Sequence, residues 1–172
     1  MTNRAGAAAP SHGLRAKCAR RGRLFGGSLS LLVLIIGCAT PTPPLDAQRT
    51  SLDAQQQWVT TSLRDYRMTV TRHCFCDPRG RGPVQVTVRE GSVAAVVDQA
   101  TSAPVADQFA SLFPTVQGLF DLIQQAERQG ADVITVVYHP SLGYPERIHI
   151  DYREDMVDEE IGFTVTGFEP IG

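Results

Sequence analysis

The chain has 172 residues, of which 16 are lysine or arginine and 18 are aspartate or glutamate, for a formal net charge of −2. The charges are unevenly spread, because all 18 acidic residues lie at or after Asp46, together with 10 arginines and no lysine. This acidic part excludes a basic nucleic-acid-binding surface, and its size predicts one small domain.

The N-terminal segment has the pattern of an export signal. Six lysines and arginines come first, and the apolar stretch over 24–37 that follows them is too short for a membrane-spanning helix, which needs ~18 residues or more. We therefore predict a cleaved signal peptide over residues 1–37, with an uncleaved N-terminal membrane helix as the alternative. The adjacent Arg20 and Arg21 also fit twin-arginine export.

The end of this segment, Ile35-Ile36-Gly37-Cys38, resembles the lipobox of bacterial lipoproteins. The resemblance implies that the mature protein begins at Cys38, with a diacylglyceryl group on its sulfur and an acyl group such as palmitate on its amine. Several acyl chains make membrane attachment durable, at ~0.8 kcal/mol per buried methylene. The implied location is the extracytoplasmic side of the cell envelope. Ala39 is similar to the residue found in outer-membrane lipoproteins, for a host with two membranes.

Residues 38–50 are predicted to be a spacer between the lipid anchor and the domain. Pro41, Pro43 and Pro44 restrict φ and favour an extended polyproline conformation over a helix or a packed strand. The remaining residues, 51–172, are predicted to fold as a single domain.

The first half of this domain is predicted to be a helix followed by three strands. The helix spans about 51–63, and its apolar contacts are Leu52, Trp58, Val59 and Leu63. Alternating apolar and polar residues predict strands at 66–74 and 84–88. Glu90-Gly91 provides a tight turn into a third strand at 92–98.

The second half repeats this order after a loop at 99–114, which carries a short turn near 107–113. Thr115 caps a helix with three-four spacing of apolar residues, and Gly130 stands where a helix commonly ends. Strands are predicted at 133–139, 146–152 and 161–168. We therefore predict an α+β fold: an antiparallel β-sheet of about six strands, with two helices packed on one face.

Three segments carry a resemblance to a known family. They are Cys74-Phe75-Cys76, the stretch over 82–88 with its turn at Gly91, and Gly143-Tyr144-Pro145 leading into the strand that holds Ile148–Asp151. Over about 65–168 the chain resembles domain of unknown function 6174, which is found in bacterial lipoproteins and secreted proteins. The resemblance implies an envelope location and an α+β fold. It carries over no catalytic residue.

The Gly143-Tyr144-Pro145 turn is the marker of this family, and we interpret its role as structural. Gly143 suits a turn, and Pro145 sets the direction of the strand that follows. Tyr144 is interpreted as a packed ring rather than a ligand contact.

Cys74 and Cys76 are the side chains best suited to redox chemistry, and three interpretations remain open. The first is a disulfide, the usual state of a cysteine pair in an exported protein. Residues two apart on a regular strand are separated by ~6.6 Å, close to the limit for bridging, so a direct bond needs a bend. Residues 77–80 follow at once and provide one.

The second interpretation is a thiol–disulfide exchange site, in which His73 or Arg72 lowers the pKa of a thiol. The third is a metal site formed by His73 and the two cysteines. A structural zinc site needs four ligands, and the chain offers only the distant His139 and His149 as further donors. We predict no bound metal and no cofactor.

Two other groups of polar residues invite a functional interpretation. His149 and Asp151 lie on the same face of a predicted strand, as a general base and its orienting carboxylate would, but no nucleophile is tied to them by a motif. The acidic residues at 154–155 and 158–160 lack the spacing and the glycine of a calcium loop. We interpret both groups as solvent-exposed, and we predict no catalytic residue.

The sequence therefore favours a non-catalytic, lipid-anchored domain of the bacterial cell envelope. Its expected partners are the membrane, reached through Cys38, and another envelope protein or component, bound through the sheet face or an exposed edge. No nucleic-acid partner is expected. The alternative is an envelope thiol–disulfide oxidoreductase or redox sensor that uses Cys74 and Cys76.

Overall fold

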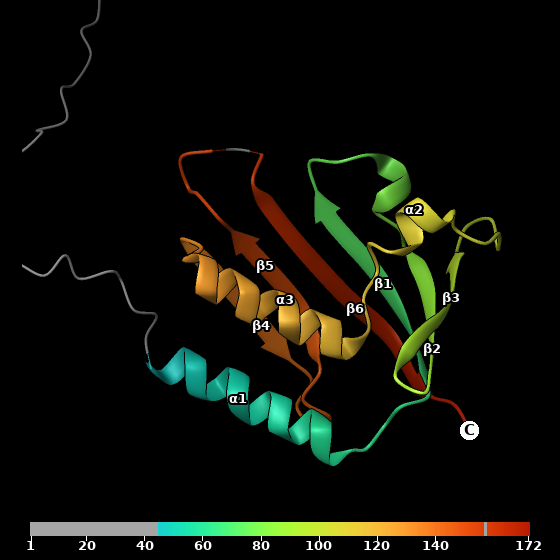
Figure 1. Ribbon diagram of the computed structural model, residues 1–172, viewed down its shortest axis with the longest axis horizontal. Coiled ribbons are helices and arrows are strands. Elements are labelled where there is room, and N and C mark those ends of the chain that lie inside the picture. Colours follow the sequence, from blue (N-terminus) through green and yellow to red (C-terminus); the bar gives the residue numbers. More distant parts are fainter. Residues whose placement is uncertain (1–44, 157) are drawn as a thin grey trace, which may run out of the picture. The chain divides into compact units, whose positions relative to one another are not determined.

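Figure 1 presents a computed structural model of the chain, which describes residues 45–156 and 158–172. The predicted signal peptide, Cys38 and most of the predicted spacer lie outside the described residues. Within the described part, no helix has both the length and the apolar character needed to cross a membrane.

The described residues form helices and strands in the predicted order. The two main helices are α1 (Leu45–Thr60) and α3 (Val116–Gln129), and short helical turns occur at η1 (Pro78–Gly80) and α2 (Asp107–Ala110). The strands are β1 (Tyr66–Cys74), β2 (Val84–Arg89), β3 (Ser92–Asp98), β4 (Val133–Tyr138), β5 (Pro145–Asp151) and β6 (Glu160–Pro170).

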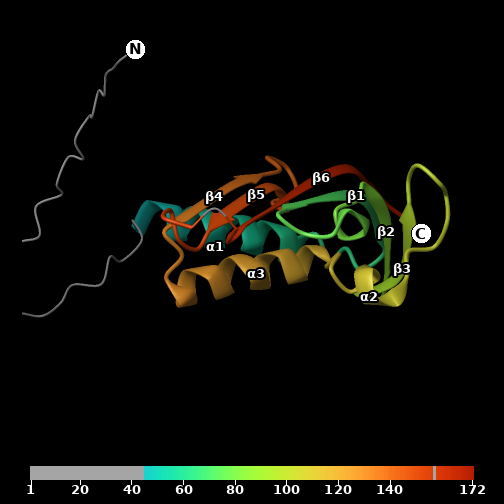
Figure 2. The ribbon, with the colours of Figure 1, turned by 90° about the horizontal axis from the view of Figure 1, so that it is seen from above.

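The six strands form one antiparallel sheet in the order β3-β2-β1-β6-β5-β4. The first strand and the last therefore lie side by side in the centre, and their pairing joins the two halves of the domain. Seen from above, α1 and α3 lie on the same side of the sheet (Figure 2). The predicted α+β fold, an antiparallel sheet of six strands with two main helices packed on it, is confirmed.

The core lies between the sheet and the two helices. Alternate residues of β1 and β2 point into it: Tyr66, Met68, Val70, Val84, Val86 and Val88 are at most 2% exposed. From the other layer, α3 contributes one continuous apolar stripe, made of Val116, Leu119, Phe120, Ile123 and Ala126. Burying each large apolar side chain contributes about 1.5–3 kcal/mol, so α3 is held mainly by its stripe.

Helix α3 begins and ends at the predicted residues. The Thr115 hydroxyl accepts a hydrogen bond from the Gly118 N–H at 3.1 Å, and Gly130 takes the left-handed conformation with φ of 72°. The buried Tyr66 hydroxyl oxygen accepts the Val116 N–H at 2.9 Å, which joins the start of α3 to β1. Burial raises the pKa of Tyr66.

Helix α1 differs from the prediction in its bounds and contacts. It begins at Leu45, inside the range assigned to the spacer, and ends at Thr60. The end is earlier than expected because the Thr61 hydroxyl donates to the Trp58 carbonyl and Ser62 turns the chain with φ of 55°. The prediction that Leu52 and Val59 contact the core is wrong, since they are 62% and 55% exposed.

The second face of the sheet carries no helix among the described residues (Figure 2). Strand alternation and register turn short polar side chains toward this side, including Thr69 and Thr71 of β1, Thr87 of β2, Thr135 of β4, and Thr164 and Thr166 of β6. We call this surface the open face. Its edge at the end of β1 adjoins the two cysteines.

Candidate functional site

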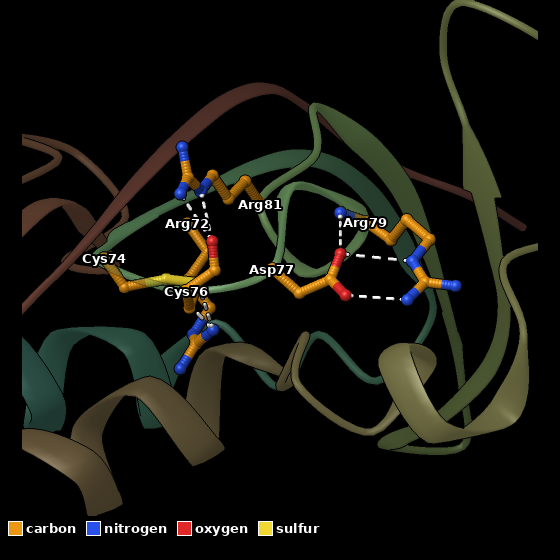
Figure 3. Close-up of a disulfide and its surroundings, with 6 residues drawn as sticks. All are labelled: Arg72, Cys74, Cys76, Asp77, Arg79 and Arg81. Atoms are coloured by element: carbon orange, nitrogen blue, oxygen red, sulfur yellow. Dashed lines mark hydrogen bonds and ion pairs between the residues drawn. A yellow bond between two sulfur atoms is a disulfide. The ribbon is translucent and has the colours of Figure 1, made fainter.

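The two cysteines lie where β1 leaves the sheet. Pairing between β1 and β6 continues as far as Cys74 and Ile161, and the chain then bends. The structure joins Cys74 and Cys76 in a disulfide with a Cα–Cα distance of 5.3 Å (Figure 3). That distance is shorter than the ~6.6 Å of a regular strand, in line with the bend. Both cysteines are half-buried, whereas Phe75 between them is 80% exposed.

Arg72 brings a positive charge to both sulfur atoms. Its Nη1 lies 3.1 Å from the Sγ of Cys74 and 3.2 Å from the Sγ of Cys76 (Figure 3). Partial burial lowers the pKa of Arg72, but a guanidinium stays protonated at any physiological pH. No carboxylate of residues 50–156 or 158–172 forms an ion pair with it.

His73, the other candidate for lowering a thiol pKa, points to the opposite side. It lies on the open face, where its Nε2 forms a 2.9 Å hydrogen bond with the Thr164 hydroxyl. Of the two groups that the sequence suggested, Arg72 therefore contacts the sulfurs and His73 does not.

Polar contacts hold the chain directly after the disulfide. The Nε and Nη2 of Arg81 both donate to the carbonyl oxygen of Cys76, the former at 3.0 Å. The carboxylate of Asp77 accepts the Arg79 N–H at 2.9 Å and forms an ion pair with the Arg79 guanidinium at 2.7 Å. Figure 3 shows that Arg72 and Arg81 approach Cys76 from different sides. We call residues 74–81 the cysteine loop.

The Asp77–Arg79 pair also changes the acidity of the loop. Hydrogen bonds from the Arg79 side chain, and then from its backbone N–H, lower the pKa of Asp77 to about 2. Arg79 in turn lies over the Phe109 ring of α2, 4.8 Å from its centroid. The cysteine loop is thus attached to its surroundings by several contacts besides the disulfide.

A shallow hollow of about 390 Å³ opens beside the disulfide. Its lining comes from the ends of β1, β5 and β6 and from the cysteine loop: His73, Cys74, Phe75, Arg81, His149, Glu160 and Gly162. The hollow exists because Gly162 stands between His73 and His149 in one row of the sheet. A side chain at Gly162 would meet the Ile148 carbonyl oxygen at 2.9 Å from its Cβ.

The described residues contain no group of three or more His, Cys, Asp or Glu side chains placed to hold a metal ion. The suggested donors Cys74 and Cys76 are bonded to each other and present no thiolate. His139 is occupied elsewhere, since its Nδ1 accepts the N–H groups of Ser141 and Leu142. The residues present therefore do not fit the zinc interpretation.

His149 and Asp151 share one face of β5, as the alternation predicts. The Oδ1 of Asp151 accepts the Arg153 N–H at 2.9 Å, so the carboxylate is bonded to backbone rather than to the imidazole. In the acidic segment after β5, Asp155 lies 3.4 Å from the Arg153 guanidinium. In the part of the chain that the structure describes, His149 and Asp151 therefore form no base-and-carboxylate pair, and the acidic residues are not grouped to hold a metal ion.

The comparisons with known proteins give a family but no function. Residues 50–170 match the family described as "Family of unknown function (DUF6174)". The chain belongs to this family. No curated protein and no solved structure matches it. The match includes most of α1, which the resemblance seen in the sequence did not reach.

The turn that marks the DUF6174 resemblance lies at the other end of the sheet from the cysteine loop. Gly143 has φ of 77°, and a Cβ there would stand 2.3 Å from the carbonyl oxygen of Ala54 in α1. Tyr144 is 4% exposed and stacks on Phe168 with ring centroids 4.7 Å apart. Pro145 is buried and begins β5. Gly143 and Tyr144, whose ring lies 6.4 Å from that of Trp58, therefore attach α1 to the sheet.

Two residues of the site, Arg81 and Gly162, carried no recognised signal in the sequence. A third residue, Arg72, carried a signal that was ambiguous. Arg72 continues the inward-pointing series of Tyr66, Met68 and Val70, and a charge in that series indicates a group that needs a special partner. The sequence could not show that this partner is the disulfide.

Proposed function

We propose that this DUF6174 protein is a non-catalytic domain of the bacterial cell envelope, held at a membrane through a lipidated Cys38, that binds another envelope protein through its open face. The observation that supports binding is the side of the six-stranded sheet that none of the described helices covers. Its threonine hydroxyl groups are donors and acceptors for the hydrogen bonds that cross such an interface.

The chemistry of the described residues supports a binding role over a catalytic one. The hollow beside the disulfide is shallow, whereas sites for small molecules are usually enclosed clefts. Its two imidazoles lack the base-and-carboxylate arrangement of a general base, because the Asp151 carboxylate is bonded to the Arg153 backbone.

The anchor is tested by the intact mass of the protein extracted from its native membranes, after thiol alkylation without reduction. A mature chain that begins at Cys38 and carries the mass of its acyl groups supports the anchor. An unprocessed N-terminus, or a Cys38 without lipid, contradicts it. The same spectrum shows whether Cys74 and Cys76 take up alkyl groups.

Binding through the open face is tested by site-specific photocrosslinking in intact cells. A photoreactive residue replaces Thr135, an exposed residue of β4 on the open face, and the control replaces Gln125, an exposed residue of α3. We expect one discrete adduct from Thr135 alone, and we expect Thr166→Arg on the same face to abolish it. Equal adducts from both positions, or an adduct that survives Thr166→Arg, would contradict the proposal.

A further inference from the structure

The cysteine loop carries a chemical feature that binding through the open face does not use. We propose that the Cys74–Cys76 disulfide undergoes reversible exchange with a dithiol of a partner protein, and that Arg72 stabilises the thiolate released. The inference stands on the contacts of the loop and is independent of the proposed function.

In the described part of the oxidised protein, the positive charge of Arg72 has no full partner. In the oxidised protein this guanidinium faces two neutral sulfurs, which are weak hydrogen-bond acceptors, at 3.1 and 3.2 Å. It is partly buried and has no carboxylate partner among the described residues. Reduction creates a thiolate at the place where this charge lacks a partner. Such a thiolate is stabilised, as with other cysteines beside arginine.

Stabilising the thiolate shifts the redox equilibrium of the disulfide toward its reduced form. A disulfide whose reduced form is stabilised is a stronger oxidant, because the equilibrium with other thiols moves toward reduction. The bond also closes a very short loop, since its cysteines are two residues apart. The loss of chain entropy that stabilises long disulfide loops is therefore small here. Both effects make the bond exchangeable.

The disulfide is accessible to a partner thiol, and it can form again after reduction. Cys74 lines the hollow and both cysteines are half-exposed, so a partner thiol can reach the bond. The loop does not depend on the bond for its position. Arg81 holds the Cys76 carbonyl directly after the bond. After reduction the two thiols remain beside Arg72, which favours closing the bond again.

The exchange balances as a two-electron transfer. A thiolate of the partner attacks one of the two sulfurs, the Cys74–Cys76 bond breaks, and the electron pair leaves on the other sulfur as a thiolate beside Arg72. The second thiol of the partner, as its thiolate, then attacks the mixed disulfide. The products are two cysteine thiols on this protein and a disulfide on the partner, and oxidation runs the same steps in reverse.

The other charged groups near the cysteine loop have partners of their own or lie across the hollow. Arg81 is bound to the Cys76 carbonyl, and Asp77 and Arg79 neutralise each other. His73 and His149 lie across the hollow with Glu160, whose negative charge opposes a thiolate. Arg72 is the cation in contact with the sulfur atoms, so its replacement is the informative change.

The test uses the mature full-length protein in detergent and three variants: Arg72→Gln, Arg72→Lys, and the control Arg79→Gln in the same loop. Two quantities are measured. One is the alkylation rate of the reduced protein against pH, and the other is the fraction reduced in glutathione buffers. Thermal unfolding of each variant shows that the fold is kept.

We expect one thiol of the wild-type protein to titrate well below the ordinary pKa of about 8.5. Arg72→Gln should raise this pKa by about one and slow alkylation at neutral pH several-fold, because less of the thiol is ionised. It should also raise the glutathione needed for half reduction, while Arg72→Lys and Arg79→Gln stay near the wild type. A structural role of Arg72 would not move the pH profile. An ordinary thiol pKa in the wild type, or the same profile in Arg72→Gln, would overturn the proposal.

Discussion

The two ends of the sheet differ in what holds them together. At the end where β1 begins, the rings of Trp58, Tyr66, Tyr144 and Phe168 contact one another with centroids 4.7 to 6.4 Å apart. We call these residues the aromatic cluster. At the end where β1 stops lie a half-buried disulfide with Arg72 and Arg81 beside it (Figure 3), and a shallow hollow. The aromatic end has contacts typical of a folding core, and the cysteine end has contacts typical of a reactive site.

This difference explains why the family resemblance contains two unrelated motifs. Gly143-Tyr144-Pro145 belongs to the aromatic end, where it lets α1 approach the sheet closely. Cys74-Phe75-Cys76 belongs to the other end, where it contributes little to the core. A family marker such as Gly143-Tyr144-Pro145 can therefore have a structural role alone. The candidate functional residues lie at the opposite end of β1, around Cys74 and Cys76.

The largest effect is expected from Gly143→Ala. Alanine would place its Cβ 2.3 Å from the Ala54 carbonyl oxygen, in a backbone conformation with φ of 77° that favours glycine. Because the Ala54 carbonyl oxygen and the Trp58 nitrogen that the Cβ would meet are both backbone atoms of α1, α1 has to move away from the sheet. We expect a loss of about 3 kcal/mol or more in the free energy of unfolding, measured by urea denaturation.

Gly130→Ala is the matched control for this prediction. Gly130 has a similar φ of 72°, but no atom lies within 4 Å of the added Cβ. The conformational cost alone is about 1–2 kcal/mol. If the two substitutions cost the same, close packing at Gly143 is not what attaches α1, and the comparison between the two ends of the sheet fails.

The elements with strong local signals were predictable from the sequence. Alternation in β1 and β2 and the capping residues Thr115 and Gly130 depend on neighbours in the chain, so single-chain patterns reveal them. Helix α1 was predicted less well, because it contacts the core mainly through Ala54 and Trp58 rather than through a continuous stripe. Its attachment at Gly143 depends on residues far apart in the sequence.

The candidate site was predictable only in part, for the same reason. The cysteines, His73 and Arg72 are close in sequence and could be named as a group. The hollow needs Gly162 and His149, which reach His73 only through the pairing of β1, β6 and β5. No local pattern shows that the first and last strands are neighbours.

A smaller effect is expected from removing the disulfide. The double variant Cys74→Ser, Cys76→Ser opens a three-residue loop, for which chain entropy predicts a loss of at most about 1.5 kcal/mol. Core residues are untouched, and Arg81 still holds the carbonyl of residue 76. Urea denaturation of both proteins, with the wild type kept oxidised, measures the difference. A loss as large as that of Gly143→Ala would mean that the cysteine end supports the fold.

The smallest effect concerns the acid titration of the cysteine loop. Hydrogen bonds from Arg79 lower the pKa of Asp77 to about 2, below its ordinary value of 3.8. A carboxyl whose pKa is lower in the folded state stabilises the fold above its unfolded pKa, and this contribution is lost as the pH falls toward about 2. The pair is exposed to solvent, so the change in stability should be slight although the change in pKa is measurable.

An NMR titration of the Asp77 carboxyl carbon measures this pKa directly. Arg79→Gln should return it toward the ordinary value, while the redox properties of Cys74 and Cys76 stay unchanged because Arg72 remains in place. An ordinary pKa in the wild-type protein would mean that the Asp77–Arg79 pair does not form in solution. Cys76 would then be held by Arg81 and the disulfide.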